Sequence, residues 1–327
     1  MRCVACDAEV RPGDQYCEAC GHKLSEPAPP LPPVPPEWVS SAGAARECPG
    51  CGGTAFGSEG YCETCGQRRP AGPDHSELAL GALAGVTDRG HRHHRNEDAM
   101  ALGRLPGAVV AVICDGVSSS TRPDAASHAA VDAAAPALLD ALAGGTDPGP
   151  AITLAARAAQ GAATLVAGAQ PGGNPPSSTF VCAVVTAAAV TVGWVGDSRA
   201  YWLPERGTAD MLTIDDSMAG QLAAAGVEVP EIARSRDAGA LLRWLGADAT
   251  DTAARLHTFT PPGPGRVLLC SDGLSRYAHT PADLAALAPV GPATDTAAAL
   301  VRHALDSGGE DNVTAVLIPF PPPEEKP

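Results

Sequence analysis

The chain has 327 residues, with 37 acidic and 22 basic side chains, a formal net charge of −15 and a hydrophobic fraction of 45%. This composition predicts a folded acidic protein of about two domains, and it disfavours nucleic-acid binding because a phosphate backbone would be repelled. The longest apolar run, residues 182–196, is too short and too often interrupted by threonine to span a membrane. No apolar targeting segment opens the sequence, so a cytoplasmic location is expected.

Two cysteine-rich segments, residues 1–24 and 48–72, precede the rest of the chain and repeat each other at an offset of 45 positions. The repeat aligns Cys3, Cys6, Tyr16, Cys17, Glu18, Cys20 and Gly21 with Cys48, Cys51, Tyr61, Cys62, Glu63, Cys65 and Gly66. Such a match in register indicates an internal duplication. Between the two repeats, the proline-rich residues 25–47 are expected to form an extended polyproline II linker.

Each repeat has the spacing C-x2-C-x10-C-x2-C, which predicts a structural zinc site. Two C-x-x-C turns supply the four thiolates that tetrahedral Zn²⁺ prefers, and segments this small need the metal in order to fold. A disulfide framework is the alternative, but it is disfavoured in a reducing compartment. Two zinc ions are therefore expected, with Cys3, Cys6, Cys17, Cys20, Cys48, Cys51, Cys62 and Cys65 as ligands. Each ion would be held either by one repeat or by a domain-swapped set of cysteines.

The pattern of residues 78–319 predicts one globular domain, followed by a disordered tail at 320–327. Helices are expected at residues 124–142, with an interruption at Pro136, and at 151–169 and 294–305. Short β-branched or apolar segments predict strands at residues 109–114, 179–185, 190–195, 200–203, 267–270 and 313–318. Helices and hairpins mix without a regular βαβ alternation, which favours an α+β fold.

Three further cysteines, Cys114, Cys182 and Cys270, lie in apolar strand-like segments. One hypothesis is a redox switch, because two of them stand close to an Asp-Gly pair. The other, which we favour, is that all three are small buried hydrophobic side chains, as free cysteines usually are.

Acidic motifs recur at the expected strand ends and turns of the globular domain. They are Asn96-Glu97-Asp98, Asp115-Gly116, Asp197 before Ser198-Arg199, Asp272-Gly273 and Asp311-Asn312. A single Asp-Gly usually marks a turn. Five acidic motifs on separate segments instead indicate carboxylates gathered around hard divalent cations such as Mg²⁺ or Mn²⁺, as in a two-metal hydrolase.

The motifs TDRGHRHHRNEDAM, VICDGV, SSTFVCAVV, VGWVGDSRAYWL, LLCSDGL and GGEDNVTAVLI resemble the metal-dependent PP2C (PPM) family of serine/threonine phosphatases over residues 85–318. The resemblance implies a sandwich of two antiparallel β-sheets flanked by helices, with the metals at one end of the sheets. The cysteine-rich segments resemble the double zinc ribbon of bacterial regulatory proteins, which implies a docking or spacing module, and we expect them to dock a protein.

The resemblance also implies roles for individual residues. Asp115 and the Gly116 carbonyl would bind metal, with Asp115 bridging two ions. Asp272 and Asp311 would complete the second ion's ligands, and Asp197 would help to form a third, weaker site. Glu97 and Asp98 would act through metal-bound water, and the water between the two Mn²⁺ or Mg²⁺ ions would attack phosphorus directly.

Three departures from the family pattern affect substrate binding. An arginine that binds phosphate in many members is replaced by His93, so that the neighbouring Arg92 is favoured for this role, with Arg95 as a second donor and a solvated basic loop as the alternative. Residues 117–120 lack the histidine that would protonate the leaving group, which leaves metal-bound water or one of the histidines at 91, 93 and 94. The segment 214–242, equivalent to a variable flap, is rich in alanine.

The sequence therefore predicts a phosphatase that acts on phosphoserine and phosphothreonine in proteins, the products of a Ser/Thr kinase. One alternative is a pseudophosphatase or binding scaffold, which the complete set of acidic residues disfavours. A second alternative is a hydrolase of small phosphate esters. No nucleic-acid or membrane partner is expected.

Overall fold

The computed structural model describes residues 2–3, 5–11, 14–24, 35–42, 51, 61–66, 74–168, 173–227 and 239–322. The chain divides into two compact units, Met1–Pro35 and Pro36–Pro327. Cys48 and residues 228–238 of the flap segment lie outside the described residues. Among the described helices, none has both the length and the apolar character needed to cross a membrane.

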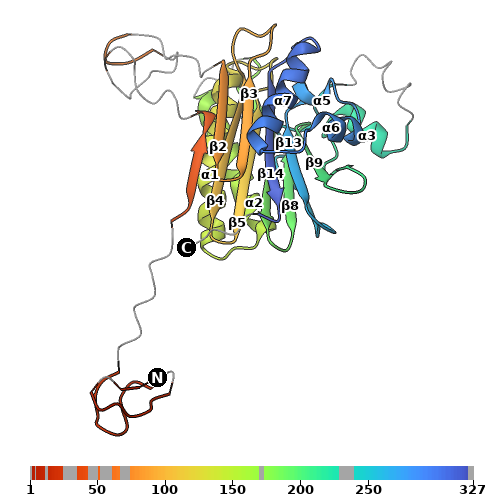
Figure 1. Cartoon of the computed structure of the whole chain (residues 1–327). Helices are drawn as coiled ribbons and strands as arrows, with labels where there is room; N and C mark the ends of the chain where they lie inside the picture. Colours follow the sequence, from red (N-terminus) through yellow and green to blue (C-terminus); the bar gives the residue numbers. More distant parts are fainter. Residues whose placement is uncertain are drawn as a thin grey trace. The chain divides into compact units, whose positions relative to one another are not determined.

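Two six-stranded antiparallel sheets form the centre of the larger unit (Figure 1). The first sheet contains, in order, β1 (Glu37–Ser40), β4 (Asp98–Leu105), β5 (Ala108–Asp115), β7 (Phe180–Thr186), β8 (Val190–Val195) and β12 (Arg255–Phe259). The second contains β10 (Asp210–Met211), β9 (Arg199–Pro204), β13 (Gly265–Cys270), β14 (Val313–Phe320), β3 (Leu83–Asp88) and β2 (His75–Leu80). A small ladder joins β6 (Ser177–Ser178) to β11 (Leu245–Gly246).

The central strand β5 shows why these sequences form a sandwich with helices outside it. Its side chains alternate between two cores: Val110 and Val112 pack toward helices, whereas Ala111 and Ile113 pack between the sheets. Successive residues of a strand point to opposite faces, so a strand covered on both faces is apolar at every position. The predicted sandwich of two antiparallel sheets flanked by helices is confirmed.

Helices cover both outer faces of the sandwich (Figure 1). α1 (Pro123–Ala143) and α2 (Pro148–Ala167) pack on the first sheet, and α5 (Asp272–Ser275), α6 (Pro281–Leu287) and α7 (Ala293–Asp306) pack on the second. The short helix α3 (Met218–Ala224) lies in the flap segment. The predicted interruption at Pro136 is wrong, because α1 runs through it. Proline removes one hydrogen bond inside a helix, and the packing of Ala134, Ala135, Leu138 and Leu139 in the core outweighs that loss.

Strand β1 falls within the segment expected to be a polyproline linker. It pairs with β4 along its whole length, with Glu37 opposite Arg104 and Ser40 opposite Ala101. Trp38 packs against the core under α1 and α2, and Val39 packs against the core between the sheets. The described part of residues 25–47 therefore contributes an edge strand to the larger unit.

The other expected elements agree with the structure to within a few residues, and α7 and β8 are close to their expected bounds. The globular pattern begins slightly earlier than residue 78, with β2 at His75, and β14 extends to Phe320. Cys114, Cys182 and Cys270 are completely buried, and this burial raises the pKa of each thiol. Because a reactive cysteine needs a low pKa and access to solvent, the buried-hydrophobe hypothesis is the better supported one.

Candidate active site

The topology brings the acidic motifs to one end of the sandwich. Asp98 begins β4 and lies opposite Asp115, the last residue of β5. In the second sheet, β13 ends two residues before Asp272, and β14 begins two residues after Asp311. Asp197 lies in the tight connection between β8 and β9. Because all neighbouring strands are antiparallel, the end of one strand and the start of the next meet at the same edge.

Asp98 links the two sheets. Its Oδ2 atom accepts hydrogen bonds from Ser271 Oγ at 2.8 Å and from Thr314 Oγ1 at 2.6 Å. Its Oδ1 atom is buried and has no hydrogen-bond partner among the described residues. A buried carboxylate oxygen without a donor is costly, and a cation or a bound water would satisfy it.

The carboxylates of this cluster raise one another's pKa values. Burial is the largest cause for Asp98, whose pKa reaches about 7 although hydrogen bonds from Thr314 and Ser271 oppose the rise. Burial followed by repulsion from neighbouring acids raises the pKa of Asp197 to about 8. The pKa values of Asp115 and Asp272 are raised by burial and by the carboxylates around them. Like charges held together out of water favour the neutral form, and a nearby cation reverses this preference.

The acid cluster should make the protein without bound divalent cations less stable as the pH rises. For Asp98 the pKa is raised from 3.8 to about 7, so between these values the folded state binds more protons than the unfolded state, and the free energy of unfolding falls. Asp98→Asn stays neutral and removes this contribution. In urea unfolding of the zinc-loaded, manganese-free protein, Asp98→Asn should therefore have a higher free energy of unfolding than the wild type, by an amount that is larger at about pH 8 than at about pH 5. A difference that does not change with pH would contradict this assignment.

Glu97 is held at the edge of the cluster by groups from three other segments. Its Oε2 atom accepts a hydrogen bond from Ser118 Oγ at 2.9 Å, and its backbone N–H donates to Asn312 Oδ1 at 2.8 Å. The imidazole of His93 lies between Glu97 Oε2, 3.7 Å from Nδ1, and Asp311 Oδ1, 3.0 Å from Nε2. Burial raises the pKa of Glu97, and the hydrogen bond from Ser118 opposes that rise.

The arginines of the basic loop, Arg92 and Arg95, form ion pairs with carboxylates that do not belong to the acidic cluster. Arg92 is exposed and pairs with Glu310 at 2.6 Å, one residue before Asp311. Arg95 pairs with Asp124 at 3.0 Å, at the start of α1. The structure thus brings His93 against the acid cluster and places Arg92 beside the loop that carries Asp311.

The segments that carry Asp272 and Asp311 are in direct contact. A Cβ atom on Gly273 would lie 1.9 Å from the carbonyl oxygen of Asn312, so only glycine permits this approach. Arg276 then connects the two carboxylates, with its NH2 atom 3.3 Å from Asp272 Oδ2 and 3.2 Å from Asp311 Oδ2. Partial burial lowers the pKa of Arg276, but attraction to the same two carboxylates outweighs it, so the pKa is raised.

Gly196, which precedes Asp197, is tied to the base of the flap segment. The N–H of Gly196 donates to Asp216 Oδ2 at 3.2 Å, and the carbonyl oxygen of Gly196 accepts from the N–H of Asp216 at 2.9 Å. The buried carboxylate of Asp216 also pairs with Arg243 and Arg255. These contacts fix both ends of the flap segment next to Asp197.

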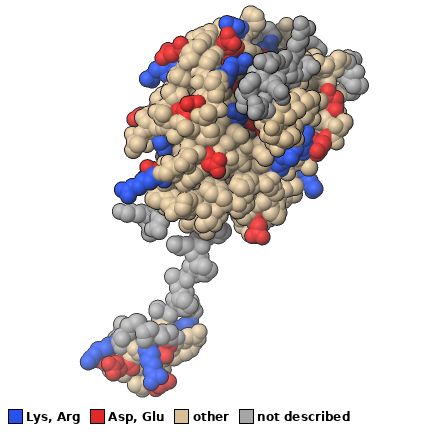
Figure 2. Space-filling view, turned by 90° about the vertical axis from the view of Figure 1, so that its right-hand side faces the viewer, with Lys and Arg blue, Asp and Glu red and all other residues tan. Residues whose placement is uncertain are grey.

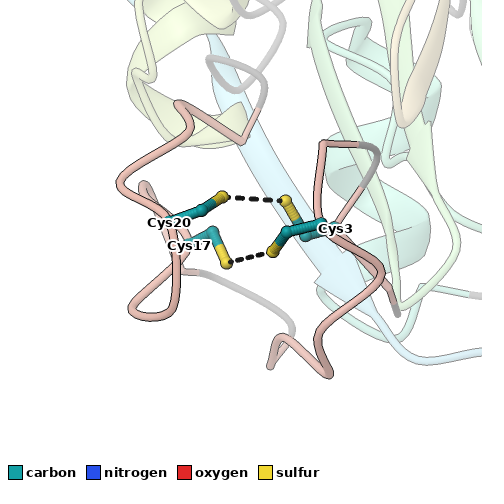
Figure 3. A group of neighbouring side chains, drawn as sticks. Cys3, Cys17 and Cys20 are labelled. Carbon is teal, nitrogen blue, oxygen red and sulfur yellow. Dashed lines mark hydrogen bonds between the residues drawn. The ribbon is translucent and has the colours of Figure 1, made fainter.

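The cysteine repeats form two similar clusters. Cys3 and Cys20 have sulfurs 3.7 Å apart, and Cys6 and Cys17 have sulfurs 3.6 Å apart (Figure 3). In the second repeat, Cys51 and Cys62 are the counterparts of Cys6 and Cys17, and their sulfurs are also 3.6 Å apart. In each cluster, the sulfurs of the described cysteines all lie within 4.8 Å of one another. The first cluster consists of Cys3, Cys6, Cys17 and Cys20, and the described part of the second consists of Cys51, Cys62 and Cys65.

The turn after each second C-x-x-C pair repeats as well. Gly21 and Gly66 donate to the carbonyl oxygens of Cys17 and Cys62, both at 2.8 Å, with φ angles of 72° and 73°. A positive φ at both positions explains why glycine recurs there. The described part of the second repeat has the local geometry of the first, which supports the duplication.

Several residues of the site were not assigned roles from the sequence. Ser271 and Thr314 hold Asp98, Ser118 holds Glu97, and Arg276 holds Asp272 and Asp311. All four lie within a few residues of an acidic motif along the chain. Proximity to those motifs is therefore the signal that could have identified them.

A family model described as Protein phosphatase 2C matches residues 87–310, which is more than half of the chain. The chain belongs to the protein phosphatase 2C family. Its acidic cluster lies where the PP2C resemblance predicted, at one end of the sandwich. The predicted identity as a serine/threonine phosphatase of this family is confirmed.

Two named relatives of the chain are bacterial phosphatases. The chain is 27% identical over 238 residues to the serine/threonine phosphatase stp of Listeria welshimeri, covering 71% of this chain and 93% of that one. It is 29% identical over 235 residues to the serine/threonine protein phosphatase PstP of Mycobacterium tuberculosis, covering 72% of this chain and 44% of that one. The chain thus spans less than half of PstP.

Solved structures with the PP2C fold superpose on the same part of the chain. A crystal structure of Mycobacterium tuberculosis PstP/Ppp has a TM-score of 0.57 and 25% identity, covering 72% of this chain and 96% of that one. The PstP catalytic domain in complex with two manganese ions has a TM-score of 0.56 and 25% identity, with the same coverage. Stp1 from Staphylococcus aureus has a TM-score of 0.62 and 24% identity, covering 75% of this chain and 97% of that one, and supports the fold.

Proposed function

We propose that this chain hydrolyses phosphoserine and phosphothreonine in proteins, at a centre of two Mn²⁺ or Mg²⁺ ions. The observation that carries the proposal is the convergence of acids from both sheets into one partly buried cluster, in which neighbouring carboxylates raise the pKa values of Asp115 and Asp272. Asp115, the Gly116 carbonyl, Asp272 and Asp311 would hold the two ions. Asp197 would contribute to a third, weaker site, and Glu97 and Asp98 would act through bound water.

The donor set suits hard divalent cations. Carboxylates are the ligands that Mg²⁺ and Mn²⁺ prefer, and Asp98 Oδ1 is buried without a donor among the described residues. Among those residues, only the cysteine clusters bring three or more ligand atoms within 4.8 Å, so the carboxylates are spread more widely than the ligands of one compact site. Such spreading is compatible with ligands shared between two ions and water.

Each residue of the site has a defined task. When bound, paired divalent cations lower the pKa of water and neutralise charge on the phosphoryl group. Ser271 and Thr314 fix the orientation of Asp98, and Ser118 fixes that of Glu97. Arg92 is our candidate for binding the substrate phosphate, and His93 is the nearest histidine to the acids for protonating the leaving group.

The choice between protein and small-molecule substrates is tested by kinetics. We expect kcat/KM for a phosphothreonine peptide to exceed that for a small phosphate ester in Mn²⁺. A higher value for the ester would favour the small-ester hydrolase, and no turnover of either substrate would favour a binding scaffold. The same measurement on several peptides would identify the class of kinase whose products it accepts.

Arg92→Ala should raise KM for the phosphopeptide more than His93→Ala does. A guanidinium binds phosphate through charge-assisted hydrogen bonds, which contribute to binding in both the ground state and the transition state. We expect an increase of roughly three- to tenfold for Arg92→Ala, measured at saturating Mn²⁺. The opposite ranking would give the phosphate-binding role to His93, and equal small effects would indicate a solvated loop.

The cysteine repeats should bind two zinc ions per chain and take no part in the chemistry. Four thiolate ligands close the coordination of zinc, which leaves no position for substrate. Elemental analysis should show two zinc ions in the wild type and one in each of Cys6→Ala and Cys51→Ala. Fewer than two in the wild type would overturn this assignment.

A protein-docking role for the ribbons and a cytoplasmic location remain our predictions. On the face drawn in Figure 2, basic and acidic side chains of the described residues are interspersed, which fits the acidic balance of the chain better than nucleic-acid binding. We therefore expect no measurable DNA binding at physiological salt.

A further inference from the structure

The acidic residues of the cluster differ in whether a positively charged side chain contacts them. Asp272 and Asp311 are both in contact with Arg276, whereas Asp98 is held by the neutral hydroxyl groups of Ser271 and Thr314. The two sides of the cluster therefore differ in charge compensation when no divalent cation is bound.

Both carboxylate oxygens of Asp311 are engaged by groups of the chain itself. Oδ2 faces the NH2 atom of Arg276 at 3.2 Å, and Oδ1 accepts from the backbone N–H of Asn312 at 3.0 Å and lies 3.0 Å from His93 Nε2. The same NH2 atom of Arg276 lies 3.3 Å from Asp272 Oδ2. One positive charge thus bridges the two carboxylates that the proposed function assigns to one metal ion.

The position of Arg276 on the chain places its side chain between the two carboxylates. Arg276 directly follows α5 and lies one turn after Asp272, so helix geometry brings the two side chains together. The next residue, Tyr277, accepts a hydrogen bond at its hydroxyl from the N–H of Glu310 at 3.0 Å. Adjacent residues therefore hold both the backbone and the carboxylate of the loop that contains Asp311.

We propose that Arg276 is a positioning residue that keeps Asp272 and Asp311 together in the metal-free protein and competes with the divalent cation for them. This inference rests on the proposed metal assignment. A divalent cation that binds these carboxylates must displace the guanidinium or share their oxygens with it, and the positive charge of Arg276 then lies beside the ion. Arg276 consequently raises the cation concentration at which this side of the site fills.

The test is calorimetric titration of the full zinc-loaded chain with Mn²⁺. Arg276→Gln should bind the Mn²⁺ ion assigned to Asp272 and Asp311 roughly three- to tenfold more tightly, as expected for the loss of two partly exposed ion pairs with the competing group. Arg276→Lys, which keeps the charge without the planar bridge, should lie between Arg276→Gln and the wild type. The matched control is Arg302→Gln, an exposed arginine on α7, which should bind as the wild type does.

Thermal unfolding supplies a readout that is independent of turnover. Without Mn²⁺, Arg276→Gln should melt at a lower temperature than the wild type, and saturating Mn²⁺ should raise its melting temperature by more than it raises that of the wild type. Unchanged or weaker Mn²⁺ binding by both Arg276 variants would overturn the inference. Asp272→Asn distinguishes failure of the Arg276 inference from failure of the metal assignment. If Asp272→Asn binds as much Mn²⁺ as the wild type does, the metal assignment itself is overturned.

Discussion

Asp115→Asn is expected to abolish turnover while leaving the fold intact. The substitution keeps the size of the side chain but removes one negative charge at the end of β5, opposite Asp98, where the proposed function requires two cations to be held together. Removing a single group that stabilises transition-state charge typically costs about 10²–10³ in rate, and we expect a loss of at least this size. The measurement is phosphate release from a phosphothreonine peptide in Mn²⁺.

The control for this change is Asp140→Asn, which makes the same substitution at an exposed position on α1 and should leave the rate unchanged. Asp272→Asn and Asp311→Asn should behave as Asp115→Asn does, whereas Asp197→Asn should cost less at saturating metal. A variant at Asp115 that keeps Mn²⁺-dependent activity above about one hundredth of the wild-type rate would contradict the two-metal assignment.

The acidic cluster was largely predictable from the sequence, because its carboxylates occupy short motifs next to strand ends. Asp98 and Asp115 belong to opposite ends of one hairpin, and antiparallel pairing necessarily brings those ends together. The contacts of Arg92 and His93 were not predictable in the same way. Both lie in a loop, and only the position of Glu310 and Asp311 in three dimensions determines which side chain faces which acid.

Two features of the fold could not be predicted from local sequence, for related reasons. Pro136 and the prolines around β1 indicate breaks or extended chain, but tertiary packing decides the outcome at both places. α1 continues through Pro136 because its apolar side chains are buried against the first sheet. β1 forms because the edge of β4 offers backbone partners and Trp38 and Val39 meet a core on each face.

Loss of strand β1 should destabilise the phosphatase unit, although the strand lies between the two cysteine repeats. A chain that starts at residue 43 loses the pairing with β4, the packing of Trp38 and the two hydrogen bonds between Ser41 Oγ and the backbone of Met100. Removal of a large side chain from a core typically costs about 3–5 kcal/mol, and the partial burial of Trp38 reduces this to about 2–4 kcal/mol. Thermal unfolding should show a melting temperature lower by at least about 5 °C.

The matched control is a chain that starts at residue 36. It also lacks the first ribbon but keeps β1, so its melting temperature and its rate of peptide hydrolysis should equal those of the full chain. Both truncated chains keep the second ribbon, which isolates the effect of β1. Equal stability of the two truncated chains would show that β1 adds nothing to the unit. A loss of hydrolysis in the chain starting at residue 36 would contradict a purely structural role for the first ribbon.

Anomalous scattering from crystals of the zinc-loaded chain soaked in Mn²⁺ tests the metal centre most directly. Data collected at the manganese edge should show two ions at the end of the sandwich, with the carboxylate of Asp115 between them and Asp272 and Asp311 on one of them. Crystals of Asp115→Asn should lose at least one of these peaks. Absence of manganese peaks beside Asp115 in the wild type, at a concentration that supports hydrolysis, would contradict the two-metal centre.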